Sequence, residues 1–233
     1  MLVLVVGATG GSGRAAVQAL VRAGHDVTAL SRHGAAMEGP RVRGVDGDAT
    51  DPAVVGRLMQ GQDAVVVTLG ISESAVRVRL RGPARTAADV RSRGTAVVVE
   101  QMRRHGVRRL VVQTSYGVGS TRERLPFVNR VVFALLLAPQ IADTEKQAAI
   151  VHASGLDWVE LQPVTLVDHE LTSPYVSADG DIRSTRASRA QVGAFLAEAA
   201  TTSGHAGVYA LSDDPKGSAA SATTKQHEPR VAR

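Results

Sequence analysis

The stretch MLVLVVGATGGSGRAAVQAL, residues 1–20, joins an apolar run to four glycines and then to a helical pattern. The apolar run at 2–6 (LVLVV) predicts a strand buried on both faces, as in a parallel sheet. Residues 12–23 have helical spacing, and Gly24 is the expected end of that helix. The glycines therefore lie where a buried strand turns into a helix.

Three of these glycines, Gly7, Gly10 and Gly13, have the spacing G-x-x-G-x-x-G. In this context the spacing predicts a dinucleotide-binding turn, and a tight turn without a ligand is the alternative. Glycine permits the sharp turn and the close approach of a pyrophosphate, and the helix N-terminus offers N–H groups to it. Hydroxyls can add further donors. The predicted phosphate-binding residues are Gly7, Thr9, Gly10, Gly11, Ser12 and Gly13.

Strand and helix patterns alternate along the rest of the chain. Further strands are predicted at 26–31, 42–46, 63–70, 108–115, 156–163 and 207–212, and helices at 52–60, 84–105, 125–139, 143–155 and 188–201. This alternation predicts an α/β, Rossmann-type fold with a doubly wound, mostly parallel sheet. We expect a single domain over 1–212 with small C-terminal cap elements, and a disordered tail over 213–233, where the sequence is polar and aperiodic.

Composition excludes several classes of site. The chain has 233 residues, 44% of them hydrophobic, and no cysteine, so disulfides and thiolate nucleophiles are ruled out. No signal peptide is visible and the apolar run 131–138 is too short to span a bilayer, so we expect a cytoplasmic protein without membrane contact. No His or carboxylate cluster has metal-ligand spacing, which predicts no metal.

The net charge of +5 comes mostly from arginine. A basic protein can bind nucleic acid. Aromatic residues make up only 3% of the chain, and the arginines form no single amphipathic stripe. We therefore expect no nucleic-acid partner, with the arginines scattered over a solvated surface and some of them serving a phosphorylated cofactor.

Two motifs resemble a known family. GATGGSG (7–13) resembles the glycine turn of the atypical short-chain dehydrogenases/reductases, and HASGLDWVELQPVTLVD (152–168) resembles a segment of their NAD(P)H-binding, NmrA-like group. That group includes biliverdin reductase B-like flavin reductases and quinone reductases. The resemblance spans about residues 1–212 and implies a Rossmann fold with a nicotinamide cofactor. Gln162 departs from it, because the family usually has Arg before the proline.

The end of the second predicted strand indicates which cofactor is used. An NAD enzyme usually carries an acid there, whereas this chain has Ser31 and Arg32. A guanidinium can bind a 2′-phosphate through paired hydrogen bonds, so we predict NADP(H). Arg14, in the first turn of the first helix, opposes the helix dipole unless a phosphate lies nearby. For both arginines the alternative is a solvated side chain.

Other strand ends provide further candidate contacts. The resemblance places Asp48, in GDATD (47–51), beside the adenine, and an Asx-turn is the alternative. Ligands bind at the carboxyl ends of strands in such sheets, so backbone groups there are expected to line the cofactor. These are Thr68, Leu69 and Gly70 on the adenosine ribose or pyrophosphate, and Pro163, Val164 and Thr165 on the nicotinamide side.

The usual catalytic motif, Tyr-x-x-x-Lys, is absent. The residues four positions after Tyr116, Tyr175 and Tyr209 are Ser120, Asp179 and Asp213. TSYG (114–117) ends the strand predicted at 108–115, and the resemblance places the family's catalytic serine there. Ser115 is the candidate for a hydrogen bond to a substrate oxygen and Tyr116 for a replacement acid, and the alternative is that both shape the turn. Lys146 either faces the nicotinamide ribose or is an exposed surface lysine.

The apolar character of the candidate pocket indicates the class of substrate. The apolar stretch 127–138 is a candidate pocket wall, with a core position or a homodimer contact as alternatives. Few polar groups suit a flat, hydrophobic small-molecule substrate. We therefore predict an NADPH-dependent oxidoreductase that transfers hydride to a small hydrophobic aromatic, quinone, flavin or polycyclic ketone. The alternatives are a non-catalytic NADP(H)-binding redox sensor and a non-redox isomerase or dehydratase.

Overall fold

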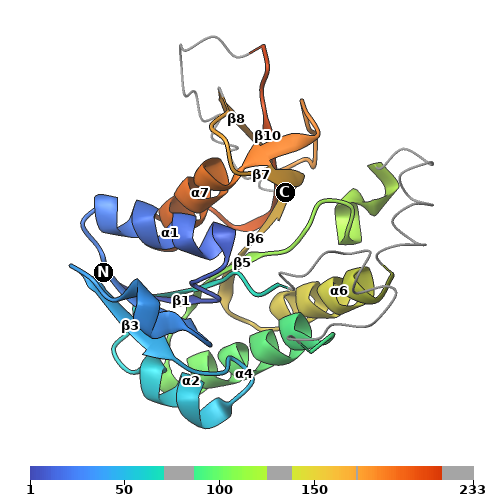
Figure 1. Cartoon of the computed structure of the whole chain (residues 1–233). Helices are drawn as coiled ribbons and strands as arrows, with labels where there is room; N and C mark the ends of the chain where they lie inside the picture. The colour runs from blue at the N-terminus through green and yellow to red at the C-terminus, as the bar shows by residue number, and fades with distance from the viewer. Residues whose placement is uncertain (71–86, 125–137, 172, 217–233) are drawn as a thin grey trace, which may run out of the picture.

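The chain folds around a central eight-stranded sheet (Figure 1). The computed structural model describes residues 1–70, 87–124, 138–171 and 173–216. The strand order is β3-β2-β1-β4-β5-β6-β10-β8, and every neighbouring pair is parallel except β10 with β8. The strands are β1 (Leu2–Val6), β2 (Asp26–Ser31), β3 (Val42–Asp46), β4 (Ala64–Val67), β5 (Arg109–Gln113), β6 (Asp157–Pro163), β8 (Pro174–Ser177) and β10 (Gly207–Asp213).

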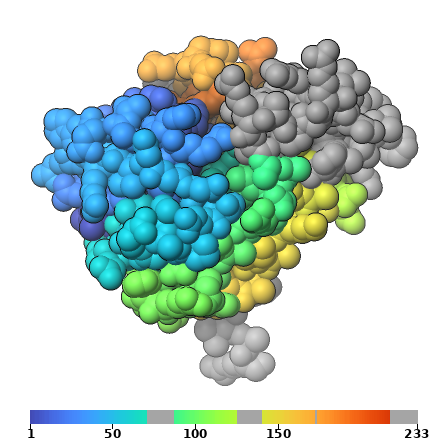
Figure 2. Space-filling model, turned by 60° about the horizontal axis from the view of Figure 1, so that its bottom comes forward, coloured from blue at the N-terminus to red at the C-terminus, as the bar shows by residue number. Residues whose placement is uncertain are grey.

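Helices cover both faces of the sheet. One face carries α1 (Gly11–Arg22) and α7 (Arg189–Thr201), and the other carries α2 (Pro52–Met59), α4 (Val90–His105) and α6 (Ala138–His152). Figure 2 shows the second face, with α2 in cyan, α4 in green and α6 in yellow side by side. Two short 3-10 helices are η1 (Gly34–Met37) and η2 (Gly119–Arg124).

The sequence of β1 explains this two-sided burial. Successive side chains of a strand point to opposite faces, so Val3 and Val5 join the core beneath α1 and α7. Leu4 and Val6 join the core beneath α2 and α4. All four side chains have no exposed surface. The predicted Rossmann-type, doubly wound, mostly parallel fold is therefore confirmed.

Several predicted boundaries are wrong. The helix predicted from 84 begins at Val90, and the helix predicted over 143–155 begins earlier, at Ala138. The helix predicted over 125–139 falls mostly outside the described residues, and its last two positions belong to α6. β10 includes Asp213, so the strand passes the expected end of the domain at 212.

The predicted cap is built partly from strands that the sequence did not indicate. β7 (Thr165–Val167) and β9 (Arg186–Ser188) form a separate parallel pair, and β8 adds an antiparallel edge to the main sheet. These strands are only three or four residues long, too short for a clear alternating pattern. In the described part of the chain, no helix is long and apolar enough to cross a membrane.

Candidate functional site

At Gly7 and Gly13 the glycine-rich turn is packed so closely that a side chain would not fit. Gly7 has a φ of +86°, and a Cβ on it would lie 2.8 Å from the carbonyl oxygen of Thr68. A Cβ on Gly13 would lie 2.3 Å from the carbonyl oxygen of Gly7. The Thr68 hydroxyl donates to that same Gly7 oxygen at 3.2 Å. Glycines therefore allow the turn between β1 and α1 to lie against the end of β4.

The N-terminus of α1 has neither a capping side chain nor an acid. Its N-cap is Gly10, which makes no side-chain cap, and the first turn contains no acidic residue. The first N–H groups of a helix have no acceptor within the helix, so this end can bind an anion. The narrow glycine turn and its free donors fit a pyrophosphate group.

The predicted residues at the end of β2 lie against this turn. The hydroxyl of Thr9 donates to the hydroxyl oxygen of Ser31 at 3.1 Å, and the Arg14 Nε donates to the Thr9 carbonyl at 3.0 Å. The backbone N–H of Gly7 donates to the Leu30 carbonyl at 2.9 Å. Thr9, Arg14 and Ser31, which are separate in the sequence, are therefore brought together.

The Asp48 carboxylate forms the Asx-turn that the sequence left open. Its Oδ1 accepts hydrogen bonds from the N–H and the hydroxyl of Thr50, both at 2.8 Å. Mainly these hydrogen bonds, helped by the charges of Arg32 and Arg93, hold the pKa of Asp48 below its usual value. The arginine at the end of β2 is therefore close enough to Asp48 to interact with it. Contact of Asp48 with adenine remains a prediction.

The ends of β4 and β6 present mostly backbone. The Leu69 side chain is buried in the core, whereas Gly70 is exposed. Pro163 is buried, and its carbonyl accepts from the Tyr116 N–H at 3.0 Å. Val164 is partly buried and Thr165 is exposed; their N–H groups donate to Leu211 and Thr185. These backbone groups at the end of β6 have partners within the protein, and contacts of the two strand ends with a cofactor remain predictions.

The candidate catalytic residues do not form a Tyr/Lys pair in the described structure. Tyr116 is 7% exposed, and its hydroxyl donates to the Gly180 carbonyl at 3.0 Å. Burial raises the pKa of this tyrosine above its usual value. Ser115 is half-buried, and Lys146 lies on the exposed face of α6. Within the described residues, no group of His and acidic side chains could hold a metal ion.

A buried polar network that the sequence analysis missed joins β5 to β6. Glu160 is fully buried, and its carboxylate accepts from Thr114 at 2.6 Å and Gln162 at 2.8 Å and pairs with His152 at 2.7 Å. Gln162 also accepts from the Thr121 hydroxyl at 2.6 Å. The glutamine that replaces the family's usual arginine thus holds the segment after β5. The signal in the sequence was Glu160 itself, because a carboxylate within a buried strand needs hydrogen-bond partners.

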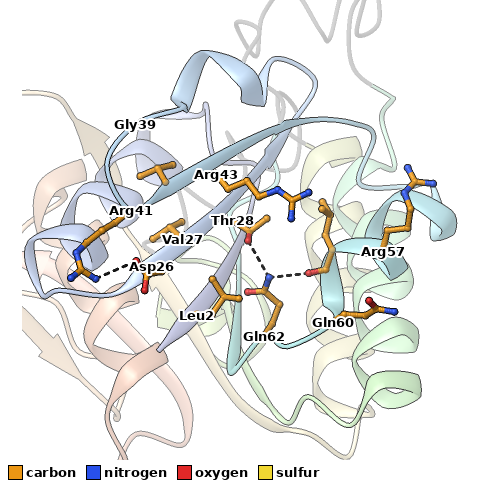
Figure 3. Close-up of a pocket in the computed structure, with 12 residues that line it drawn as sticks. Leu2, Asp26, Val27, Thr28, Gly39, Arg41, Arg43, Arg57, Gln60 and Gln62 are labelled. Atoms are coloured by element: carbon orange, nitrogen blue, oxygen red, sulfur yellow. Dashed lines mark hydrogen bonds and ion pairs between the residues drawn. The ribbon is translucent and has the colours of Figure 1, made fainter.

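A hollow of about 370 Å³ lies at the opposite edge of the sheet (Figure 3). It is formed near the amino ends of β1 and β2, and three arginines line it: Arg41, Arg43 and Arg57. Arg41 pairs with Asp26 at 3.2 Å. In open α/β sheets ligands bind at the carboxyl ends of the strands, so this hollow is separate from the glycine-rich site.

Comparisons with known proteins agree with the site. A family model described as NAD(P)H-binding matches residues 7–203. The chain belongs to this NAD(P)H-binding family. The expected NAD(P)H-binding family and a nicotinamide cofactor are thereby confirmed. The match does not distinguish NADP from NAD.

Solved structures share the fold at low sequence identity. The anaerobillin reductase ChuY from Escherichia coli O157:H7 is 22% identical, with a TM-score of 0.69 over 94% of this chain and 100% of that one. A Rossmann-fold NAD(P)-binding family protein from Shigella flexneri is 21% identical, with a TM-score of 0.67 over 91% and 93%. A short-chain dehydrogenase/reductase from Veillonella parvula is 14% identical, with a TM-score of 0.72 over 92% and 94%.

Proposed function

We propose that this protein is an NADPH-dependent reductase of small hydrophobic acceptors. The observation that carries the proposal is the first turn of α1, which follows a tightly packed glycine turn and has no capping side chain. Such a turn binds the pyrophosphate of a dinucleotide through backbone N–H groups. The family match supports the nicotinamide part of the cofactor.

The residues at the end of β2 account for the choice of NADPH. Ser31 and Arg32 occupy the place where an NAD-binding protein usually carries an acid. The guanidinium of Arg32 binds the 2′-phosphate, and Arg14 adds positive charge beside the turn. The ends of β4 and β6 hold the ribose and the nicotinamide through backbone groups. When bound, the reduced nicotinamide supplies the hydride.

The Tyr116 hydroxyl is bonded to the Gly180 carbonyl and Lys146 is exposed, which favours an acceptor that needs little acid catalysis. Ser115 donates a hydrogen bond to an oxygen of the substrate, and solvent supplies the proton. Small aromatic compounds, quinones, flavins and polycyclic ketones meet this requirement. The shared fold with a protein named anaerobillin reductase adds a conjugated tetrapyrrole to the acceptors worth testing.

A redox sensor is the second candidate function, and the position of Tyr116 favours it. The hydroxyl of this tyrosine is hydrogen-bonded to the Gly180 carbonyl, and Lys146 is exposed. A protein that binds NADP(H) without turnover needs no proton donor. An isomerase or a dehydratase would likewise leave the amount of NADPH unchanged.

The first experiment is a nicotinamide fluorescence titration with NADPH and NADH, followed by absorbance assays with the acceptor panel. We expect Arg32→Ala to weaken NADPH binding about tenfold or more and NADH binding less than twofold, because only NADPH loses a charged hydrogen bond. Arg43→Ala, at the other edge of the sheet, is the matched control.

The outcomes separate the candidate functions. Equal losses of NADPH and NADH affinity in the Arg32 variant would exclude the phosphate contact. Tight NADPH binding without oxidation by any acceptor would favour the sensor or the non-redox enzyme. Stoichiometric NADPH oxidation would establish the reductase.

A further inference from the structure

The side chain of Arg189, the first residue of α7, lies across Gly11 in the first turn of α1. Its Cδ and Nε atoms are 2.4 Å from the position that a Cβ on Gly11 would take. Any side chain at this position would displace the arginine from the place that it occupies. The guanidinium stem is thus adjacent to the backbone groups that we assign to the cofactor phosphates.

The start of α7 is held firmly in this place. A Cβ on Gly193 would lie 2.4 Å from the carbonyl carbon of Ala15, so α7 and α1 are in close contact. Ser188 and Gln191 form a complete capping box, in which the Ser188 hydroxyl accepts from the Gln191 N–H at 3.1 Å. The position of Arg189 relative to the glycine turn is therefore fixed by packing and by its own helix cap.

The ionic partner of Arg189 is exchangeable. Its guanidinium pairs with the Asp168 carboxylate at 2.6 Å, and the two side chains are 30% and 88% exposed, respectively. An ion pair with so exposed a carboxylate contributes little to the stability of the fold. The cation also lies in the first turn of α7, where it opposes the helix dipole. A doubly charged diphosphate is a better partner than one solvated carboxylate.

We propose that Arg189 binds the pyrophosphate of the dinucleotide, and that Asp168 holds its guanidinium when no cofactor is bound. This inference rests on the proposed function, because it requires a dinucleotide at the first turn of α1. Binding exchanges an exposed ion pair for charge-assisted hydrogen bonds to phosphate oxygens. Gly11 and Arg189 then act together: the glycine provides the space and the arginine provides the charge.

The test compares two ligands by calorimetric titration of the full chain. NADPH contains the diphosphate, whereas adenosine 2′-phosphate has only the group assigned to Arg32. We expect Arg189→Ala and Arg189→Gln to weaken NADPH binding about tenfold. Both variants are expected to bind adenosine 2′-phosphate within twofold of wild type. Arg32→Ala is expected to weaken both ligands.

Asp168→Asn is the matched control for a purely structural ion pair. It breaks the same pair but leaves the guanidinium in place, so we expect NADPH to bind at least as tightly as to wild type. Equal loss in the Asp168 and Arg189 variants would overturn the proposal, as would wild-type NADPH affinity in a folded Arg189→Gln protein. Failure of wild type to bind any dinucleotide would overturn the proposed function as well.

Discussion

The helices α1 and α4 differ in whether a side chain accepts hydrogen bonds from the N–H groups of their first turn. At α4, the buried Asp143 carboxylate from α6 accepts from the N–H groups of Arg91 at 3.0 Å and Ser92 at 3.2 Å. At α1, Gly10 provides no side-chain acceptor and is exposed. One helix end is completed within the protein and stabilises the fold. The other has no side-chain cap, and in the proposed function its N–H groups bind the cofactor phosphates.

Adding an acid to the open end should have the largest effect. Gly10 has a φ of −66°, which other residues adopt, and a Cβ there would lie 3.3 Å from the Gly7 carbonyl oxygen, so Gly10→Asp needs a shift of only a few tenths of an ångström. Aspartate is a good N-cap and changes stability by only a few tenths of a kcal/mol relative to glycine. Its charge opposes the cofactor phosphates, and we expect NADPH affinity to fall about 100-fold by fluorescence titration.

Gly10→Asn separates charge from shape in this experiment. Asparagine also caps helices and has nearly the same size, so it should weaken NADPH binding much less than aspartate. Similar losses in both variants would mean that the side chain blocks the site sterically. Unchanged affinity in both would mean that the first turn of α1 does not bind phosphate.

Removing the acid from the closed end should affect stability instead. Asp143→Ala leaves the buried N–H groups of Arg91 and Ser92 without their acceptor. We expect a loss of about 2 kcal/mol in the free energy of unfolding, or about 4–8 °C in Tm. The matched variant Asp143→Asn should recover part of this loss. Thermal unfolding by circular dichroism measures both, and a Tm equal to wild type would refute the capping role.

The smallest effect is expected at Asp48, where the turn before α2 depends on pH. The folded state holds the pKa of Asp48 below its unfolded value. This group therefore stabilises the fold at pH values above its unfolded pKa, and the contribution is lost as pH falls through the folded pKa. Asp48→Asn keeps an Asx-turn without the charge. The free energy of unfolding of this variant, measured with urea, should fall less than that of wild type between pH 5 and 3. Parallel plots of this free energy against pH for the two proteins would contradict the prediction.

Local patterns in the sequence were sufficient for the parallel strands of the main sheet and for the glycine turn. A continuous apolar run such as Val3–Val6 predicts a strand of a parallel sheet, because such a strand is buried on both faces. This signal lies within the run itself and needs no information from distant residues. The proximity of Thr9 to Ser31 follows from the same logic, since adjacent parallel strands end at one edge of the sheet.

The remaining contacts depend on distant parts of the chain meeting in space. The position of Arg189 over Gly11 and the partners of Glu160 are set by packing between elements, which a pattern within one segment does not indicate. The role of Tyr116 was left open for the same reason, because its hydroxyl partner, Gly180, lies in the cap. The apolar stretch 127–138, predicted as a pocket wall, lies largely outside the described residues.

The contact between α1 and α7 has a consequence for synthesis of the chain. These helices are the first and last of the described structure, so Ala15 can meet Gly193 only after the long segment between them has been translated. Contacts between such distant positions form late, because a long loop must close first. On the ribosome, the glycine turn emerges long before the helix that covers it. A nascent chain therefore completes this side of the sheet only after α7 has been synthesised, long after α1.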